Sequence, residues 1–173
     1  MAGTFEDVAA GIDYLAELKD QSVDIDLTRV AVVGHSAGGQ LALWSASAQA
    51  VRRVRPKAVA GLAAVVDLEK VHALDPNASV PAELLGGPPE TCLSRYRAFS
   101  PHALLPLGVP QLIMHGARDE SLAPALSQAY AQSAQALGDI VEYVELAEAD
   151  HMVYLDPLSD AHFVLCCWLS GMV

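Results

Sequence analysis

The sequence predicts an α/β fold in which a mainly parallel sheet of about four strands is flanked by helices. Two observations predict it. Several short apolar runs lack alternating polar residues, which is typical of strands buried on both faces in a parallel sheet. These runs alternate along the chain with segments whose apolar residues recur at helical spacing. The 173 residues suffice for one such domain with a core, which we assign to residues 1–173.

The predicted elements follow one another without a linker or an internal repeat. Strands are expected at 29–33, 58–66, 110–115 and 140–146, and helices at 5–18, 38–50, 124–137 and 157–169. Between the second and third strands, residues 68–109 are rich in proline and have weak periodicity. We expect a cap-like or lid-like excursion there, with short helices near 82–85 and 90–96. Its structural alternative is a simple cover for one end of the sheet.

Composition excludes several classes of protein. A net charge of −11 argues against nucleic-acid binding, which needs clustered Lys and Arg. The basic cluster Arg52, Arg53, Arg55 and Lys57 is interpreted as a solvated connection that favours the end of the preceding helix. No apolar run is long enough to span a membrane, and the N-terminus has no signal-peptide pattern, so we expect a cytoplasmic protein.

The cysteines indicate neither a disulfide nor a metal site. Cys92, Cys166 and Cys167 are odd in number, two of them are adjacent, and no Cys-x-x-Cys spacing occurs. We expect buried or partly buried thiols in a reducing compartment.

The motif most informative about function lies between the first strand and the helix that follows it. Residues 30–40 read VAVVGHSAGGQ, an apolar strand that enters a Gly-x-Ser-x-Gly turn. This pattern is typical of a nucleophile elbow, a tight turn that exposes a serine at the start of a helix. Gly34 and Gly38 are expected to supply the small residues that the turn requires. The backbone N–H of Ala37 could then stabilise an oxyanion beside Ser36.

A serine nucleophile needs a histidine to accept its proton and a carboxylate to orient that histidine. Asp119 follows the third predicted strand and His151 follows the fourth, so both should lie with Ser36 at the carboxyl ends of the strands. Asp67, which ends the second strand, is the alternative acid. The order Ser, Asp, His is the order expected in α/β-hydrolases.

The other five histidines receive secondary roles. His35 is expected to point away from Ser36, and His115 to support the acid loop. His162 is expected to be a packing or surface residue, while His72 and His102 could line a substrate pocket.

Together these residues resemble the α/β-hydrolase superfamily, and within it the esterase and lipase branch that includes kynurenine-formamidase-like and hormone-sensitive-lipase-like enzymes. The resemblance covers essentially the whole chain. It is carried by Gly34-His35-Ser36-Ala37-Gly38-Gly39, Leu112-Ile113-Met114-His115-Gly116-x-x-Asp119 and the late His151, together with Ser100-Pro101 and Leu107-Gly108-Val109-Pro110. It implies that Ser36 is the nucleophile, His151 the general base, Asp119 the orienting acid and Ala37 an oxyanion donor, with no metal or cofactor.

One departure from this superfamily is large. Its members usually carry several strands before the nucleophile strand, and a His-Gly-Gly-Gly-like loop that provides a second oxyanion donor. Here only Gly3 and Gly11 precede Gly34, so the chain resembles the superfamily without its N-terminal half. We therefore expect strand 29–33 to be an exposed sheet edge that a homo-oligomer covers, and activity to be weak.

These observations predict a serine hydrolase that cleaves small carboxylic esters through an acyl-enzyme. The alternatives are a serine peptidase of the prolyl-oligopeptidase type, an arylformamidase and, from another class, a non-catalytic half-hydrolase that acts as an interaction module.

Overall fold

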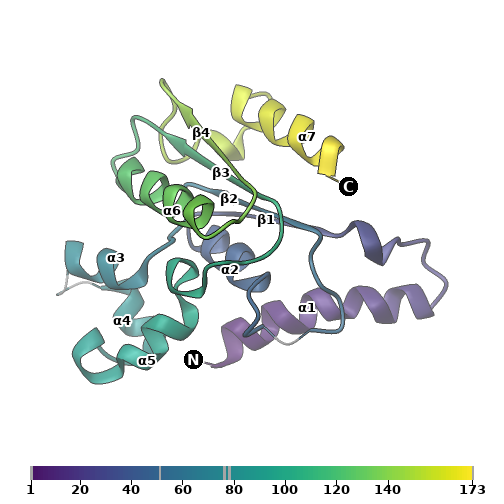
Figure 1. Ribbon diagram of the computed structural model, residues 1–173, viewed down its shortest axis with the longest axis horizontal. Helices are drawn as coiled ribbons and strands as arrows, with labels where there is room; N and C mark the ends of the chain where they lie inside the picture. Colours follow the sequence, from purple (N-terminus) through teal and green to yellow (C-terminus); the bar gives the residue numbers. More distant parts are fainter. Residues whose placement is uncertain (1, 51, 76, 78, 173) are drawn as a thin grey trace.

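The computed structural model describes residues 2–50, 52–75, 77 and 79–172, and it places four strands in one parallel sheet (Figure 1). The strand order is β1-β2-β3-β4, and each neighbouring pair is parallel. The strands are β1 (Ala31–His35), β2 (Ala58–Leu62), β3 (Gln111–Gly116) and β4 (Val141–Leu146). The predicted α/β class and its four strands are thus confirmed.

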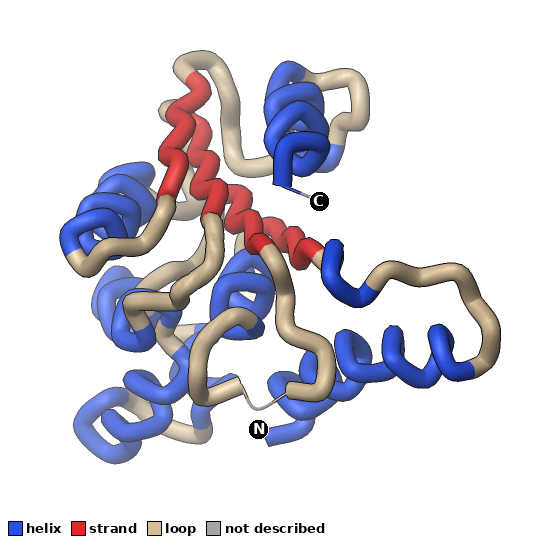
Figure 2. The backbone as a smooth tube through the Cα atoms, turned by 45° about the vertical axis from the view of Figure 1, so that its right-hand side comes forward, coloured by secondary structure: helices blue, strands red, loops and turns tan. Residues whose placement is uncertain are grey.

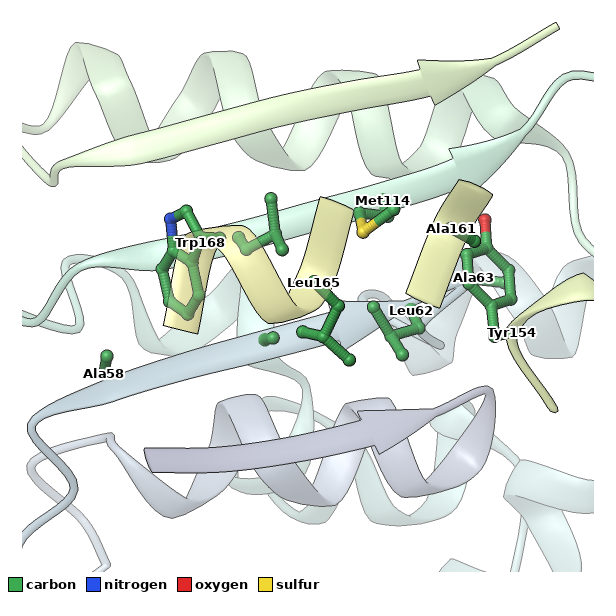
Figure 3. Close-up of a cluster of buried hydrophobic side chains, with 10 residues drawn as sticks. Ala58, Leu62, Ala63, Met114, Tyr154, Ala161, Leu165 and Trp168 are labelled. Atoms are coloured by element: carbon green, nitrogen blue, oxygen red, sulfur yellow. The ribbon is translucent and has the colours of Figure 1, made fainter. Parts of the chain in front are cut away.

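Helices cover both faces of this sheet (Figure 2). One face packs against α7 (Asp160–Met172), through Leu165 and Trp168, which contact β2 and β3 residues such as Leu62 and Met114 (Figure 3). The other face packs against α2 (Ala37–Ser45) and α6 (Pro124–Ala136), whose Leu43 and Tyr130 are fully buried. Because successive strand residues point to opposite faces, the side chains of both inner strands are covered on both faces of the sheet.

Burial along the strands follows from their places in the sheet. Every residue of β2 and of β3 is buried, which explains why these strands are mostly apolar, and the polar Gln111 and His115 of β3 are hydrogen-bonded. β1 and β4 form the two edges of the described sheet, and both are partly exposed. In β1 the exposed fraction of Val33 is 39%. The first strand is therefore an edge strand, as its sequence position suggested.

Residues 68–109 form a helical excursion with its own small core. It contains α3 (Leu68–Leu74), α4 (Val80–Leu85), α5 (Pro89–Phe99) and the 3-10 turn η3 (Pro101–Leu104). Leu68, Leu85 and Tyr96 are buried together. The predicted helices correspond to α4 and α5, whereas α3 was not predicted. Gln40 ties the excursion to α2, since its Nε2 donates to the Phe99 carbonyl over 2.8 Å.

Several boundaries differ from the sequence predictions for local reasons. The first helix, α1 (Ala2–Asp20), is longer at both ends than predicted. The predicted strand 58–66 ends at Leu62, because Ala63 adopts a positive φ of 44° and turns the chain. The predicted helix 38–50 ends at Ser45, whose carbonyl accepts a hydrogen bond from Nε of Arg52 over 2.9 Å.

Two expectations about side-chain environment require correction. Arg52 is half-buried, with its guanidinium 5.0 Å from the ring centre of Trp44, so this member of the basic cluster is not a solvated residue. Cys166 and Cys167 are exposed rather than buried, because α7 turns Ala161, Leu165 and Trp168 toward the sheet. Across the described residues, no helix has the length and apolar character needed to cross a membrane.

Candidate active site

Ser36 occupies a strained turn between β1 and α2. Its φ of 54° and ψ of −119° lie in a region that residues other than glycine rarely adopt. The turn is held by backbone hydrogen bonds, because the Ser36 N–H donates to Leu62 over 2.9 Å and the Ser36 carbonyl accepts from Val65 and Gln40. Such strain persists only where the surroundings enforce it, and it is common at functional sites.

The tight packing of the elbow depends on Gly34 and Gly39. A Cβ atom on Gly34 would lie 2.0 Å from the Gly38 carbonyl oxygen, and one on Gly39 would lie 2.6 Å from the Cβ of Ala64. A Cβ on Gly38 would meet nothing within 4 Å. The predicted need for a small residue is confirmed at Gly34 and wrong at Gly38. The motif does not show that α2 approaches the segment after β2 at Gly39 and not at Gly38.

The structure brings Ser36, His151 and Asp119 together from three separate loops. His151 Nε2 lies 3.0 Å from Ser36 Oγ, and His151 Nδ1 lies 2.7 Å from Asp119 Oδ2. Each residue follows the carboxyl end of a strand, namely β1, β3 or β4, where parallel strands present their loops at one edge. The arrangement has the connectivity of a serine nucleophile, a general base and an orienting acid.

The environment of Asp119 favours its charged form. Its side chain is fully buried, and Oδ1 accepts hydrogen bonds from the N–H groups of Ser121 and Leu122 over 2.8 and 2.9 Å. Burial alone would raise the pKa of this carboxyl, but the hydrogen bonds from His151, Leu122 and Ser121 outweigh burial and hold the pKa below its usual value. The carboxylate can therefore stay ionised opposite a His151 imidazolium.

His35 contacts the base, which corrects the expectation that it points away from the site. Its Nε2–H donates to the His151 carbonyl over 2.7 Å, and the two imidazole ring centres are 4.7 Å apart. Its ring is also 5.7 Å from that of Tyr154. The sequence signal was the presence of a histidine as the last residue of the nucleophile strand. The path of the loop that bears His151 was not visible in the sequence.

Asp67 is not brought to His151. Its Oδ2 lies 3.3 Å from His102 Nδ1, and its Oδ1 accepts from the Lys70 N–H at the start of α3. Asp67 therefore caps a helix and pairs with His102. Of the two carboxylates considered as the acid, only Asp119 contacts His151.

The remaining histidines are dispersed. His102 lines a small hollow of about 160 Å³ together with Asp67 and Ser100, and its Nε2 contacts Ser133 Oγ over 3.0 Å. His72 is buried, with Nδ1 2.7 Å from Ser79 Oγ. His162 lies half-buried on α7. His115 contacts Asp119, as its expected role beside the acid loop requires.

Ala37 is the first residue of α2 and is exposed. The first N–H groups of an α-helix have no acceptor within the helix, so this group is free to meet an oxyanion beside Ser36. A hollow of about 390 Å³ adjoins the base and could receive part of a substrate. It is lined by Arg118, Glu120, Ser121, Asp150, His151 and Met152. Among the described residues, no group of three or more His, Cys, Asp and Glu side chains could hold a metal ion.

Comparisons with known proteins agree with this fold. A family model described as the prolyl oligopeptidase family matches residues 2–162. Within the α/β-hydrolases, this family corresponds to the prolyl-oligopeptidase type, which was the alternative to the esterase branch. No curated protein matches the sequence.

Solved structures resemble the chain at low sequence identity. An acetyl ester-xyloside bifunctional hydrolase from Caldicellulosiruptor lactoaceticus has a TM-score of 0.76 and 22% identity, covering 96% of this chain and 65% of that one. A thermophilic esterase from Thermogutta terrifontis has a TM-score of 0.70 and 17% identity over 96% and 62% of the two chains. An acylaminoacyl peptidase from Pyrococcus horikoshii has a TM-score of 0.74 and 19% identity over 96% and 26%.

These likenesses show the fold. The present chain spans about two thirds or less of each of these three proteins.

Proposed function

We propose the function of this chain from two premises: it belongs to the prolyl oligopeptidase family, and it aligns a serine, a histidine and a buried aspartate in one hydrogen-bonded chain. The chain has the fold of hydrolases. The finer proposal is a serine hydrolase that cleaves small carboxylic esters through an acyl-enzyme. The observation that carries it is the contact of His151 with Ser36 on one ring nitrogen and with Asp119 on the other.

In the proposed reaction, Ser36 Oγ forms a bond to the ester carbonyl carbon while His151 Nε2 accepts the hydroxyl proton. The negative charge that develops on the carbonyl oxygen is stabilised by the Ala37 N–H. The bond to the alcohol then breaks, and His151 returns its proton to the departing alkoxide. Water, deprotonated by the same nitrogen, then attacks the acyl carbon, the bond from that carbon to Ser36 Oγ breaks, and His151 returns the proton to Ser36 as the acid leaves. Asp119 remains ionised throughout.

The rate is proposed to be low. Ala37 is the one backbone donor that we assign to the oxyanion, and loss of a single donor costs about 10²–10³ in kcat in serine hydrolases. Because the same donor serves both tetrahedral intermediates, we expect both formation and hydrolysis of the acyl-enzyme to be slow.

A fluorophosphonate probe tests the proposal, because it reacts only with an activated serine. We expect labelling of the wild-type chain and none of Ser36→Ala, while Ser94→Ala, which changes an exposed serine on α5, labels normally. Hydrolysis of p-nitrophenyl acetate and butyrate should follow the same pattern. A well-folded wild-type chain that neither labels nor hydrolyses these esters would contradict the proposal and favour a non-catalytic interaction module.

Peptide hydrolysis is the second candidate, since the family is named for an oligopeptidase and one structural neighbour is an acylaminoacyl peptidase. A matched pair of substrates separates the two functions: an N-acetylalanine p-nitroanilide and the corresponding p-nitrophenyl ester. We expect kcat/KM to favour the ester by far more than the intrinsic difference in reactivity of the two substrates. The opposite preference would assign this chain to the peptidases.

A further inference from the structure

His115 lies directly behind the candidate acid. It is the fifth residue of β3, and none of its side chain is exposed. Its Nε2 lies 3.1 Å from Asp119 Oδ2 and 3.1 Å from the Leu122 carbonyl oxygen. Its Nδ1 lies 2.7 Å from Oγ of Ser127, a buried residue of α6. Both ring nitrogens therefore have partners inside the protein.

These partners determine where the His115 proton resides. A carbonyl oxygen and a carboxylate oxygen can only accept hydrogen bonds, so Nε2 must carry the proton. Burial lowers the pKa of His115 below its ordinary value, and the hydrogen bond to Leu122 and the charge of Asp119 oppose this only in part. The ring is thus neutral, Nδ1 is an acceptor, and the Ser127 hydroxyl donates to it.

The result is one chain of hydrogen bonds that runs through the candidate site. Ser127 donates to His115, whose Nε2–H faces both the Leu122 carbonyl and Oδ2 of Asp119, each 3.1 Å away, and His151 Nδ1–H donates to the same Oδ2. The other Asp119 oxygen accepts two backbone N–H groups. Three hydrogen bonds and the shared His115 N–H therefore hold the carboxylate opposite His151.

We infer that His115, kept in its Nε2–H tautomer by Ser127, is a positioning residue that acts through Asp119 on His151. Its N–H aligns Oδ2 with His151 and takes up part of the carboxylate charge, which limits how strongly that charge stabilises a His151 imidazolium. This inference rests on the proposed function. Asp119 and His151 are the ionisable side chains that interact with His115, and Tyr154, whose pKa is raised by burial, is neutral beside Asp119.

The first test is independent of activity. The ¹⁵N shifts of the imidazole rings report their tautomers, and we expect His115 to be Nε2–H and neutral from pH 5.5 to 8. Ser127→Ala, a small change, removes the donor to Nδ1 and should yield a mixture of tautomers. An Nδ1–H tautomer or an imidazolium in the wild-type chain would overturn the inference.

The second test compares two replacements of His115. His115→Leu removes the donor, whereas His115→Gln carries an amide N–H of comparable reach. In His115→Leu we expect the ¹H resonance of His151 Nδ1–H to move downfield, because Asp119 Oδ2 then accepts this hydrogen bond without a competing donor, and we expect His115→Gln to keep the wild-type position. On p-nitrophenyl acetate, kcat should fall about 10- to 100-fold in His115→Leu, as is common when a supporting hydrogen bond is lost, with KM within about twofold.

The two tests separate failure of this inference from failure of the proposed function. If Ser36 does not react with the fluorophosphonate, the tautomer of His115 and the His151 Nδ1–H resonance still report whether His115 acts through Asp119. An unchanged His151 Nδ1–H resonance in a folded His115→Leu protein would overturn the inference even if the enzyme is active. If His115→Leu does not fold, His115→Gln and Ser127→Ala are used instead. A Ser127→Ala protein in which the tautomer of His115 and kcat are both unchanged would overturn the inference.

Discussion

At the scale of single residues, two histidines with no proposed role in proton transfer lie in direct contact with the candidate base and acid. His35 donates to the backbone carbonyl of His151, and His115 Nε2 lies 3.1 Å from Oδ2 of Asp119. The base His151 is therefore held by a residue of β1, and the acid Asp119 lies against a residue of β3. Such outer partners hold reacting groups within the narrow tolerances that catalysis requires.

The His35 contact leads to a prediction about turnover. His35→Phe keeps an aromatic ring between β1 and Tyr154 but removes the N–H that holds the His151 carbonyl. We expect kcat/KM on p-nitrophenyl acetate to fall about three- to tenfold, since one such hydrogen bond contributes about 0.5–1.5 kcal/mol. The matched control is His162→Phe on α7, which should retain full activity. Equal activity of the two variants would show that the His151 loop needs no anchor at His35.

A second residue-scale prediction concerns stability as a function of pH. The pKa of His115 is lowered in the folded state by burial, whereas in the unfolded chain it lies near the usual value of about 6.5. As pH falls below that value, the unfolded chain binds a proton that the folded chain does not, so the free energy of unfolding decreases. The contribution of His115 is thus fully present above about pH 6.5 and is lost as pH falls toward its folded pKa.

Urea unfolding at pH 7, 6 and 5 measures this effect. We expect a shallower loss of stability in His115→Gln than in the wild-type chain, because glutamine does not titrate. If the free energy of unfolding fell equally with pH in the two proteins, His115 would bind a proton as readily in the folded chain as in the unfolded chain.

At the scale of elements, the site depends on how closely α2 approaches the sheet. The helix begins at Ala37, directly after the strained serine, and its Gly39 faces Ala64 in the segment that follows β2. The excursion between β2 and β3 is attached to the same helix by the hydrogen bond of Gln40 to Phe99. The position of α2 thus links the elbow to the segment that we predict to act as a cap.

Two adjacent glycines of α2 provide a matched pair of variants. Gly39→Ala would place a Cβ 2.6 Å from that of Ala64, so we expect a loss of about 1–3 kcal/mol in the free energy of unfolding through overpacking. Gly38→Ala meets nothing within 4 Å, and alanine favours a helix over glycine by up to about 1 kcal/mol, so this variant should be as stable as the wild type or more so. Urea unfolding of both measures the difference, and equal effects would contradict the described packing.

At the scale of the whole molecule, the edge of the sheet at β1 is the least protected feature. In the described structure β1 pairs only with β2, on one side. The Lys57 N–H donates to the Val30 carbonyl, and the Ser36 N–H donates to the Leu62 carbonyl. The backbone N–H and C=O groups of even-numbered residues in and beside β1 therefore point toward β2. Odd-numbered residues of β1 therefore direct their N–H and C=O groups to the open edge. An exposed apolar edge of this kind favours pairing with another chain.

We propose that a second copy of the chain covers this edge in a symmetric dimer. Light scattering of the wild-type chain is expected to give a dimer mass or larger. Val33→Lys, which places a charge on a residue that is already 39% exposed, should shift the equilibrium toward monomer without loss of fluorophosphonate labelling. A wild-type chain that stays monomeric and well folded at every concentration would contradict the proposal.

The sequence by itself determined the fold class, the four strands and the candidate residues Ser36 and His151, with Asp119 and Asp67 as the two possible acids. It could do so because strand and helix periodicities are local, and because the carboxyl ends of parallel strands always meet at one edge. Only the tertiary structure decided which glycine α2 needs, that Asp119 and not Asp67 contacts His151, and that His35 and His115 hold the base and the acid. These depend on close approaches between segments up to 116 residues apart, such as His35 and His151, and no local pattern of residues encodes such distances.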